Sequence, residues 1–258
     1  MAMADAVAFF EERAADWEQT CYPDPVRRRL EALIVEFDVQ PRACVLDVGT
    51  GPGVLLPYLR QRVGAGGRIC AFDLAFNMVR QAANKALAPQ DGVMQADVHC
   101  LPFQSGVFDR IVCFAAFPHF AQPALALQEM RRVLSPGGRV VIAHLMSRAE
   151  LARHHGTHAS VARDVLPSHA KMRLLFEAAG LVLDSIEDLP GRYLAKGTHA
   201  VETGVSGLDR NGVRSARTQS SVPGAGPHRT GLRAAGEKGR PFGPLPWQPG
   251  PAPCGGRV

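Results

Sequence analysis

The stretch that most constrains the fold of this chain is V-L-D-V-G-T-G-P-G, which begins at residue 45. An apolar run ends in an acid, Asp47, and leads into a turn that contains Gly49, Gly51 and Gly53. Leucines and a valine then recur at helical spacing. Glycine in such a turn permits backbone dihedrals closed to other residues and removes the Cβ that would hold a ligand away. The pattern predicts a strand, a glycine turn and a helix, which together bind a nucleotide-like ligand at the edge of a parallel sheet.

The spacing of the glycines narrows the choice of ligand. A dinucleotide site needs G-x-G-x-x-G, and here Val54 stands where the third glycine would be. The Gly-Lys-Ser/Thr ending of a phosphate-binding P-loop is also absent from this turn. An acid such as Asp47 would repel a pyrophosphate, whereas it suits a ligand with a cationic group. The turn therefore favours a nucleoside ligand with a positive charge.

The same strand-helix rhythm repeats along the chain. Two further strands end in acids, Asp73 and Asp97. The last two expected strands flank Pro190 and Gly191, which predicts an antiparallel hairpin. The expected strands cover residues 68–73, 92–97, 108–114, 139–144, 181–186 and 192–196, and the expected helices 75–87, 122–134 and 168–179.

Both ends of the chain differ from this central pattern. Residues 4–19 have the apolar spacing of one amphipathic helix, and a second helix begins near Pro23 and Pro25. We assign residues 1–40 to a helical lid and residues 41–199 to the ligand-binding domain. Residues 203–258 hold 12 glycines and 8 prolines, which predicts a disordered, Arg-rich tail over residues 200–258. Out-of-frame reading of a GC-rich gene would give a similar composition.

Around residues 7–197 the sequence resembles the class I S-adenosylmethionine-dependent methyltransferases, in their small-molecule, type 11-like form. The resemblance rests on the D-x-G-x-G-x-G turn, on the acids at successive strand ends, and on Leu101-Pro102-Phe103 and Phe108-Asp109. It implies a doubly wound, Rossmann-like α/β fold, with a mostly parallel seven-stranded sheet and a C-terminal antiparallel hairpin. It also implies S-adenosyl-L-methionine as the cofactor and methyl transfer as the activity.

The resemblance and the strand ends together assign a cofactor site. Asp73 can accept hydrogen bonds from both ribose hydroxyls, and in the family an acid such as Asp97 accepts from the adenine amino group. Met78 could pack on the adenine face or simply fill the core. The expected cofactor-binding residues are Asp47, Gly49, Thr50, Gly51, Gly53, Asp73, Leu74, Met78, Ala96, Asp97, Val98 and Phe114.

Histidines are the candidates for catalysis, because methyl transfer needs a base only when the acceptor arrives protonated. His119 and His144 follow the fourth and fifth strands, at the edge that carries the glycine turn. The Phe-Pro-His-Phe sequence around His119 lacks the Pro-Pro-aromatic motif of methyltransferases that act on DNA or protein amides. His154 and His158 share helical spacing, but Gly156 interrupts that helix, so we expect no metal site.

Charge and cysteine content bound the partners and the compartment. Eight basic residues but only two acids lie in residues 203–258, so the net charge of +5 does not indicate a nucleic-acid-binding domain. No cysteines have C-x-x-C spacing, no apolar run could span a membrane, and the N-terminus lacks a basic leader. We therefore expect a cytoplasmic enzyme acting on a small molecule. A non-catalytic S-adenosylmethionine-binding regulatory module is the alternative, and an NAD-dependent oxidoreductase is disfavoured by Val54.

Overall fold

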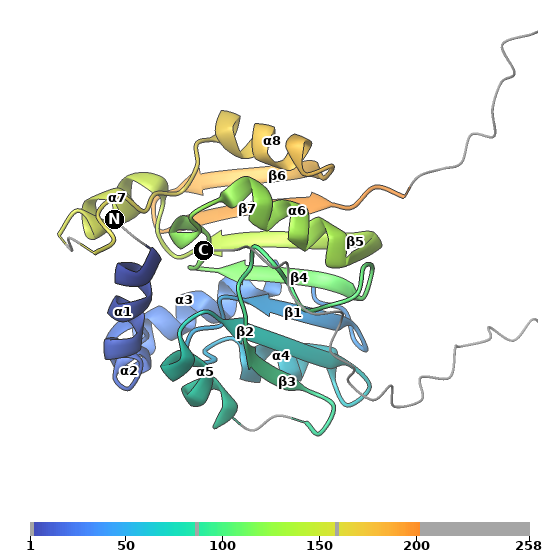
Figure 1. The fold of residues 1–258 in the computed structure, drawn as a ribbon, viewed down its shortest axis with the longest axis horizontal. Coiled ribbons are helices and arrows are strands. Elements are labelled where there is room, and N and C mark those ends of the chain that lie inside the picture. The colour runs from blue at the N-terminus through green and yellow to red at the C-terminus, as the bar shows by residue number, and fades with distance from the viewer. Residues whose placement is uncertain (1–2, 86–87, 158–159, 202–258) are drawn as a thin grey trace, which may run out of the picture. The chain divides into compact units, whose positions relative to one another are not determined.

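The protein is built around a seven-stranded mixed sheet (Figure 1). The structure is a computed structural model that describes residues 3–85, 88–157 and 160–201. The strand order is β3-β2-β1-β4-β5-β7-β6. The first five strands in this order are parallel, β7 is antiparallel to β5, and β6 is antiparallel to β7. The predicted fold class is therefore confirmed. The strands are β1 (Cys44–Val48), β2 (Arg68–Asp73), β3 (Gly92–Gln95), β4 (Phe108–Phe114), β5 (Leu134–His144), β6 (Val182–Leu189) and β7 (Arg192–Thr198).

Helices cover both faces of the sheet because neighbouring residues of each strand point to opposite faces. In β1, Leu46 packs with the core that contains α6 and α8, whereas Val45 packs with the core that contains α3 and α4. The helices are α1 (Met3–Arg13), α2 (Trp17–Cys21), α3 (Asp24–Val35), α4 (Leu56–Val63), α5 (Phe76–Ala83), η1 (Phe117–His119), α6 (Pro123–Val133), α7 (Arg148–His155) and α8 (His169–Ala178). In Figure 1, α1, α2 and α7 lie beyond the carboxyl ends of the parallel strands.

The N-terminal segment differs from the single helix expected over residues 4–19. It breaks into α1 and α2, and the buried Ala14 packs at the break against Ala75 and Met78. The break turns the Trp17 ring back onto Phe10, with 5.4 Å between the ring centroids. Tertiary packing of the aromatic rings has therefore overridden a continuous helical pattern.

Two other elements differ from the expected ranges. β5 begins at Leu134, before the start that we expected at residue 139, and the added segment includes Gly137, which has a φ of +80°. α7 lies in a stretch without clear apolar periodicity. Its start is fixed by a capping box, in which the Ser147 side chain and Glu150 satisfy each other's backbone N–H groups.

The described residues test only in part what we expected of membrane spans and cysteines. No helix among the described residues is long and apolar enough to cross a membrane. Within the described ranges, Cys21, Cys44, Cys70 and Cys113 are free thiols. The predicted tail lies outside the described residues from 202 onward, and so does Cys254.

Candidate active site

The glycine turn connects β1 to α4 through three left-handed glycines with φ between +56° and +82°. A Cβ at Gly49 would collide with the Ala116 methyl, and a Cβ at Gly53 would press on Leu56 and Ala82. A Cβ at Gly51 would meet no atom within 4 Å, because this glycine faces an open cavity. Gly49 and Gly53 thus permit close packing, and Gly51 leaves room for a ligand.

Asp47 is a buried carboxylate directly before this turn, with 1% of its surface exposed. Its Oδ2 accepts a hydrogen bond of 2.6 Å from the Thr50 hydroxyl. Burial raises the pKa of Asp47 from 3.8 to about 7, the Thr50 hydrogen bond opposes the rise, and the nearby Asp73 charge adds to it. A buried carboxylate in this state would be stabilised by a cation placed beside it.

Asp73 ends β2 and faces the glycine turn. Its Oδ2 accepts from the Gly51 N–H at 2.8 Å, and its Oδ1 accepts from the Ala75 N–H at 2.9 Å. Burial raises the pKa of Asp73, and these two backbone hydrogen bonds oppose the rise. The carboxylate is therefore held in a fixed orientation at the cavity.

Asp97 lies two residues beyond the end of β3 and forms a pair with His99. The Asp97 Oδ1 accepts from the His99 backbone N–H at 2.9 Å and lies 2.6 Å from the His99 Nδ1. The Nε2 of His99 accepts from the Gln122 N–H at 3.2 Å, so Nδ1 carries the proton and donates to Asp97. Both nitrogens of His99 are thus engaged, and its ring fixes the Asp97 carboxylate.

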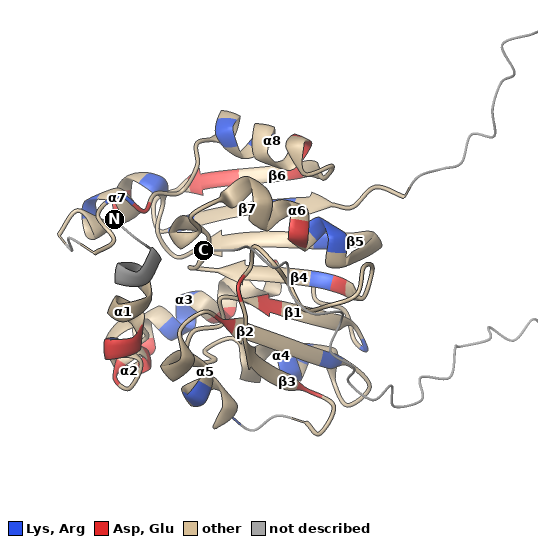
Figure 2. Ribbon diagram, viewed as in Figure 1, with Lys and Arg blue, Asp and Glu red and all other residues tan. Residues whose placement is uncertain are grey.

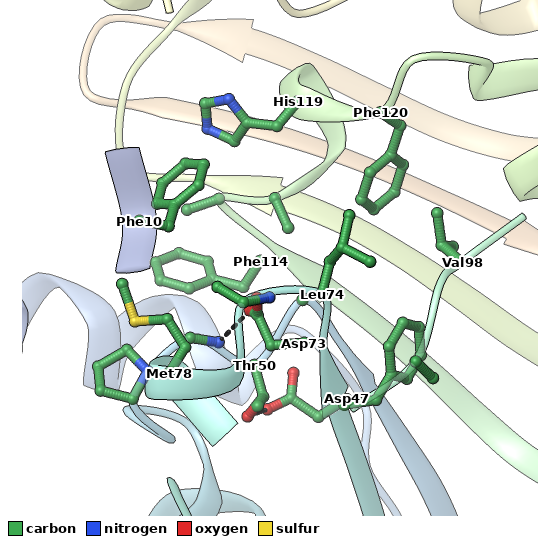
Figure 3. Close-up of a pocket in the computed structure, with 18 of the residues that line it drawn as sticks. Phe10, Asp47, Thr50, Asp73, Leu74, Met78, Val98, Phe114, His119 and Phe120 are labelled. Atoms are coloured by element: carbon green, nitrogen blue, oxygen red, sulfur yellow. Dashed lines mark hydrogen bonds between the residues drawn. The ribbon is translucent and has the colours of Figure 1, made fainter. Parts of the chain in front are cut away.

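These groups line a first cavity of about 140 Å³ (Figure 3). In Figure 3, Asp47 and Thr50 lie on one side of the cavity and His119 on the other, with Asp73 between them. Gly53 is the one expected cofactor residue that does not line it; Gly53 instead allows the close approach of α5. The expected residues that do line it are Asp47, Gly49, Thr50, Gly51, Asp73, Leu74, Met78, Ala96, Asp97, Val98 and Phe114.

The helices of the predicted lid, α1 and α2, contribute Phe10 and Trp17 to the wall of this cavity, and acidic residues gather on these helices (Figure 2). Glu11 of α1 accepts hydrogen bonds from the backbone N–H groups of Phe76 (2.6 Å) and Asn77 (2.7 Å). These are among the first N–H groups of α5, whose own N-cap residue, Ala75, has no side-chain acceptor. The lid therefore caps α5 from outside and is fastened to it.

A second cavity of about 630 Å³ adjoins the first. Aromatic rings line much of it, from Phe9 and Phe10 on α1 to Trp17, Tyr22 and Phe114. The residues that line both cavities are Phe10, Trp17, Tyr22, Phe114, Ala115 and His119. Ala115 has a φ of +57°, a strained conformation for a residue other than glycine, where the chain leaves β4.

Two imidazoles in this cavity are held by one residue, Asp164, from the segment between α7 and α8. The Asp164 Oδ2 lies 2.7 Å from Nδ1 of His119. The Asp164 backbone carbonyl accepts from Nδ1 of His155 at 2.6 Å. Because a carbonyl or a carboxylate only accepts, Nδ1 of each ring carries a proton. In the neutral form, Nε2 of His119 and of His155 is then a hydrogen-bond acceptor.

His144 carries its proton on the other ring nitrogen. Its Nδ1 accepts a 2.9 Å hydrogen bond from the Met146 N–H, so the proton of the neutral ring is on Nε2. Burial, and then the neighbouring imidazoles, lower the pKa of His144 to about 3. His144 lines only the second cavity, where it is a neutral donor. His119 and His144 therefore lie in the same cavity with different hydrogen-bonding character.

Metal binding has no support within residues 3–85, 88–157 and 160–201. No group of three or more His, Cys, Asp or Glu in these ranges is placed to hold an ion. His158, considered with His154 as a possible ligand, lies outside the described residues. His154 itself lines the second cavity.

Several site residues could not be identified from the sequence. Asp164 lies 45 residues from His119, in a stretch without periodicity, and no local pattern connects them. Phe10 and Phe120 look like ordinary apolar positions, although both line the first cavity. The sequence did contain a signal for His99. The side chain of an acid such as Asp97 commonly accepts a hydrogen bond from the backbone two residues later, which forms a tight local turn.

Comparison with known proteins identifies relatives of the central part of the chain. Residues 46–142 match the family model described as a methyltransferase domain. A demethylmenaquinone methyltransferase from Thermus thermophilus is 36% identical over 119 residues, which are 45% of this chain and 53% of that protein. A malonyl-[acyl-carrier protein] O-methyltransferase from Enterobacter lignolyticus is 34% identical, over 43% of each chain. A 37.1 kDa protein of transposon TN4556 from Streptomyces fradiae is 34% identical over 55% of this chain and 39% of that protein. The chain thus spans about half the length of the curated relatives it matches.

Solved structures share the fold at lower sequence identity. A chain from the complex between the Haloferax volcanii Trm112 methyltransferase activator and a methyltransferase superposes with a TM-score of 0.65 and 24% identity, covering 74% of this chain and 98% of that one. The structure of a SAM-dependent methyltransferase from Aquifex aeolicus gives a TM-score of 0.59 and 23% identity, covering 72% of this chain and 98% of that one. At these identities the similarity concerns the fold.

Proposed function

We propose, from the match of residues 46–142 to the methyltransferase-domain family model, that the chain transfers a methyl group from S-adenosylmethionine to a small-molecule acceptor bound in the second cavity. The quinone and acyl-carrier-protein substrates in the relatives' names belong to those proteins. The acceptor must be argued from this chain's own cavity.

The first cavity suits the cofactor in chemistry. Gly51 leaves open space where any side chain would intrude, and Asp47 offers a buried negative charge to a cationic ammonium group. Asp73 would accept from ribose hydroxyls, and Asp97, held by His99, from the adenine amino group. When bound, the cofactor supplies an electrophilic methyl group on a sulfonium, a good leaving group.

The observation that carries the proposal is the wall shared by the two cavities. Phe114, Ala115 and His119 line both of them. A ligand in the first cavity and a ligand in the second would therefore meet at this wall. Methyl transfer requires such an arrangement, because the protein's main task is to bring donor and acceptor into line and to exclude water.

His119 is the proposed general base. Asp164 holds the proton on Nδ1 of His119 and leaves Nε2 able to take a proton from the acceptor. The edge of the ring packs on Phe10, with 5.0 Å between centroids, which fixes its orientation. His144 cannot take this role, because its Nδ1 is engaged by Met146 and its Nε2 carries a proton.

The test measures S-adenosylhomocysteine formed from S-adenosylmethionine in the presence of a panel of two-ring phenols, hydroxyketones and quinols. We expect product with at least one of them. His119→Ala should then lower kcat by roughly 10²–10⁴-fold with cofactor affinity unchanged, and Asp164→Asn should lower it by a smaller factor. His169→Ala is the matched control, because His169 is exposed and lines neither cavity.

Two other outcomes would contradict parts of this proposal. Tight binding of S-adenosylmethionine without product from any acceptor would favour the regulatory module. Product formation with kcat unchanged in His119→Ala would remove the base from the mechanism.

A further inference from the structure

Two histidines of the second cavity, His119 and His144, have opposite hydrogen-bonding character, and His155 has the same acceptor character as His119. His119 offers an acceptor at Nε2, because Asp164 fixes its proton on Nδ1. His144 offers a donor at Nε2, because the Met146 N–H occupies its Nδ1. Among the described residues, the hydrogen bonds of the two rings are made through Nδ1, to Asp164 and from Met146. A bound molecule must therefore supply a donor to one ring and an acceptor to the other.

The aromatic part of the cavity wall is suited to a flat apolar body. Phe10 and Trp17 pack edge to face, and Tyr22 and Phe114 lie 6.2 Å apart between centroids. Such faces favour ring systems. The Arg29 guanidinium, which also lines the cavity, donates to the carbonyls of Leu145 and Gly191. The Arg29 side chain is thus already paired with backbone carbonyls.

Resting on the proposed methyl transfer, we propose that the acceptor is a fused-ring molecule with a hydroxyl group next to a carbonyl oxygen. The hydroxyl donates to Nε2 of His119 and the carbonyl accepts from Nε2 of His144. His144 is therefore a specificity-determining residue, and not a second base. Of these two histidines, His119 lines both cavities and His144 lines only the second. The hydroxyl bound to His119 is therefore the group that receives the methyl.

The transfer balances with these groups alone. The acceptor O–H bond breaks and its proton moves to Nε2 of His119, which becomes an imidazolium paired with the Asp164 carboxylate. The oxygen electron pair forms the new O–C bond as the S–C bond breaks and its pair returns to sulfur. The hydrogen bond from His144 to the carbonyl withdraws charge from the conjugated system and makes the hydroxyl more acidic.

Binding of two probes tests this inference without turnover. The probes are 3-hydroxychromone, which has a hydroxyl next to a ring carbonyl, and 2-naphthol, which has a hydroxyl alone on a similar two-ring frame. Their dissociation constants are measured by calorimetry with S-adenosylhomocysteine present. We expect 3-hydroxychromone to bind about tenfold more tightly, the size of one additional buried hydrogen bond.

Two variants at residue 144 isolate the donor. His144→Asn keeps an acceptor for the Met146 N–H but is too short to donate into the cavity, so it should remove the preference for 3-hydroxychromone and leave 2-naphthol binding unchanged. His144→Gln, which keeps a donor at a similar reach, should restore part of the preference. Unchanged S-adenosylhomocysteine affinity in both variants verifies the fold.

Equal affinity of the wild type for the two probes would overturn the inference, and so would a preference that persists in His144→Asn. Because the readout is binding, it is independent of whether methyl transfer is observed. A failure of the proposed function would appear instead as absence of S-adenosylhomocysteine formation.

Discussion

Gly51 and Gly64 share a left-handed backbone and open space around the position of a Cβ, yet only Gly51 faces the first cavity. Gly51→Val should weaken S-adenosylmethionine binding by well over tenfold, because the new side chain enters the space of the ligand. Gly64→Val also strains a position with positive φ (+63°), but should leave cofactor affinity unchanged because it is away from the first cavity. Calorimetric titration of both variants checks this. Equal binding by Gly51→Val and the wild type would place the cofactor elsewhere.

Asp47 gives a prediction about pH. Its pKa is raised from 3.8 to about 7, so between these values the unfolded chain loses the proton while the folded chain retains it. The free energy of unfolding therefore falls as pH rises through this window. Asp47→Asn should be more stable than the wild type at pH 8, by a few kcal/mol in order of magnitude, and equally stable near pH 4. Urea unfolding at the two pH values measures the difference.

The raised pKa of Asp47 also gives a prediction about proton release on cofactor binding. A cationic ligand group beside Asp47 favours the ionised carboxylate, so cofactor binding near pH 6.5 should release a proton. Calorimetry in buffers of different ionisation enthalpy measures this release, and Asp47→Asn should abolish it. A stabilised Asn variant that binds the cofactor as well as the wild type would show that Asp47 has no role in binding.

At the scale of elements, α1 is fastened to α5 by Glu11, whose carboxylate caps the first turn of α5. The first cavity of about 140 Å³ is smaller than the roughly 300 Å³ at which ligand pockets begin. We therefore expect α1 to move when a nucleoside ligand enters. Glu11→Ala should speed both binding and release of S-adenosylhomocysteine about tenfold, since it removes two charge-assisted hydrogen bonds.

Stopped-flow fluorescence provides the measurement, because Trp17 lines the cavity. Glu12→Ala is the control: it removes the same charge from the next position of α1, where the side chain is 75% exposed and lies 3.7 Å from Arg13. Exchange rates that do not differ between the two variants would contradict the role of Glu11.

The elements also show what the sequence can and cannot predict. The cofactor cavity could be predicted because its residues follow strand ends, and parallel strands bring their carboxyl ends to one edge. Asp47, Asp73 and Asp97 reach the first cavity in this way. The acceptor cavity depends on aromatic packing that breaks the N-terminal helix and on the contact between His119 and Asp164. Such long-range contacts leave no periodic signal in the sequence.

At the scale of the whole molecule, the sheet is complete before the predicted tail begins. Beyond β7, the His199 backbone bonds to Gly137 and Gly138, and its ring lies 2.9 Å from the Leu134 carbonyl. Truncation after residue 202 should therefore leave the Tm and cofactor affinity unchanged. Truncation after residue 196 removes these bonds and the pairing of Thr198 with Arg139, and should lower the Tm by several degrees. Thermal scans of the two truncated proteins test this; a Tm below that of the full chain for the protein ending at residue 202 would mean that the tail contributes to the fold.

The double role of α1 imposes an order of events. Phe10 is a wall of both cavities, so the lid movement that admits the cofactor also opens the acceptor cavity. The acceptor cavity is complete only after the lid has closed over the cofactor. We expect compulsory-order kinetics with the cofactor first, and we expect high acceptor concentrations to inhibit turnover by holding the demethylated product behind the closed lid.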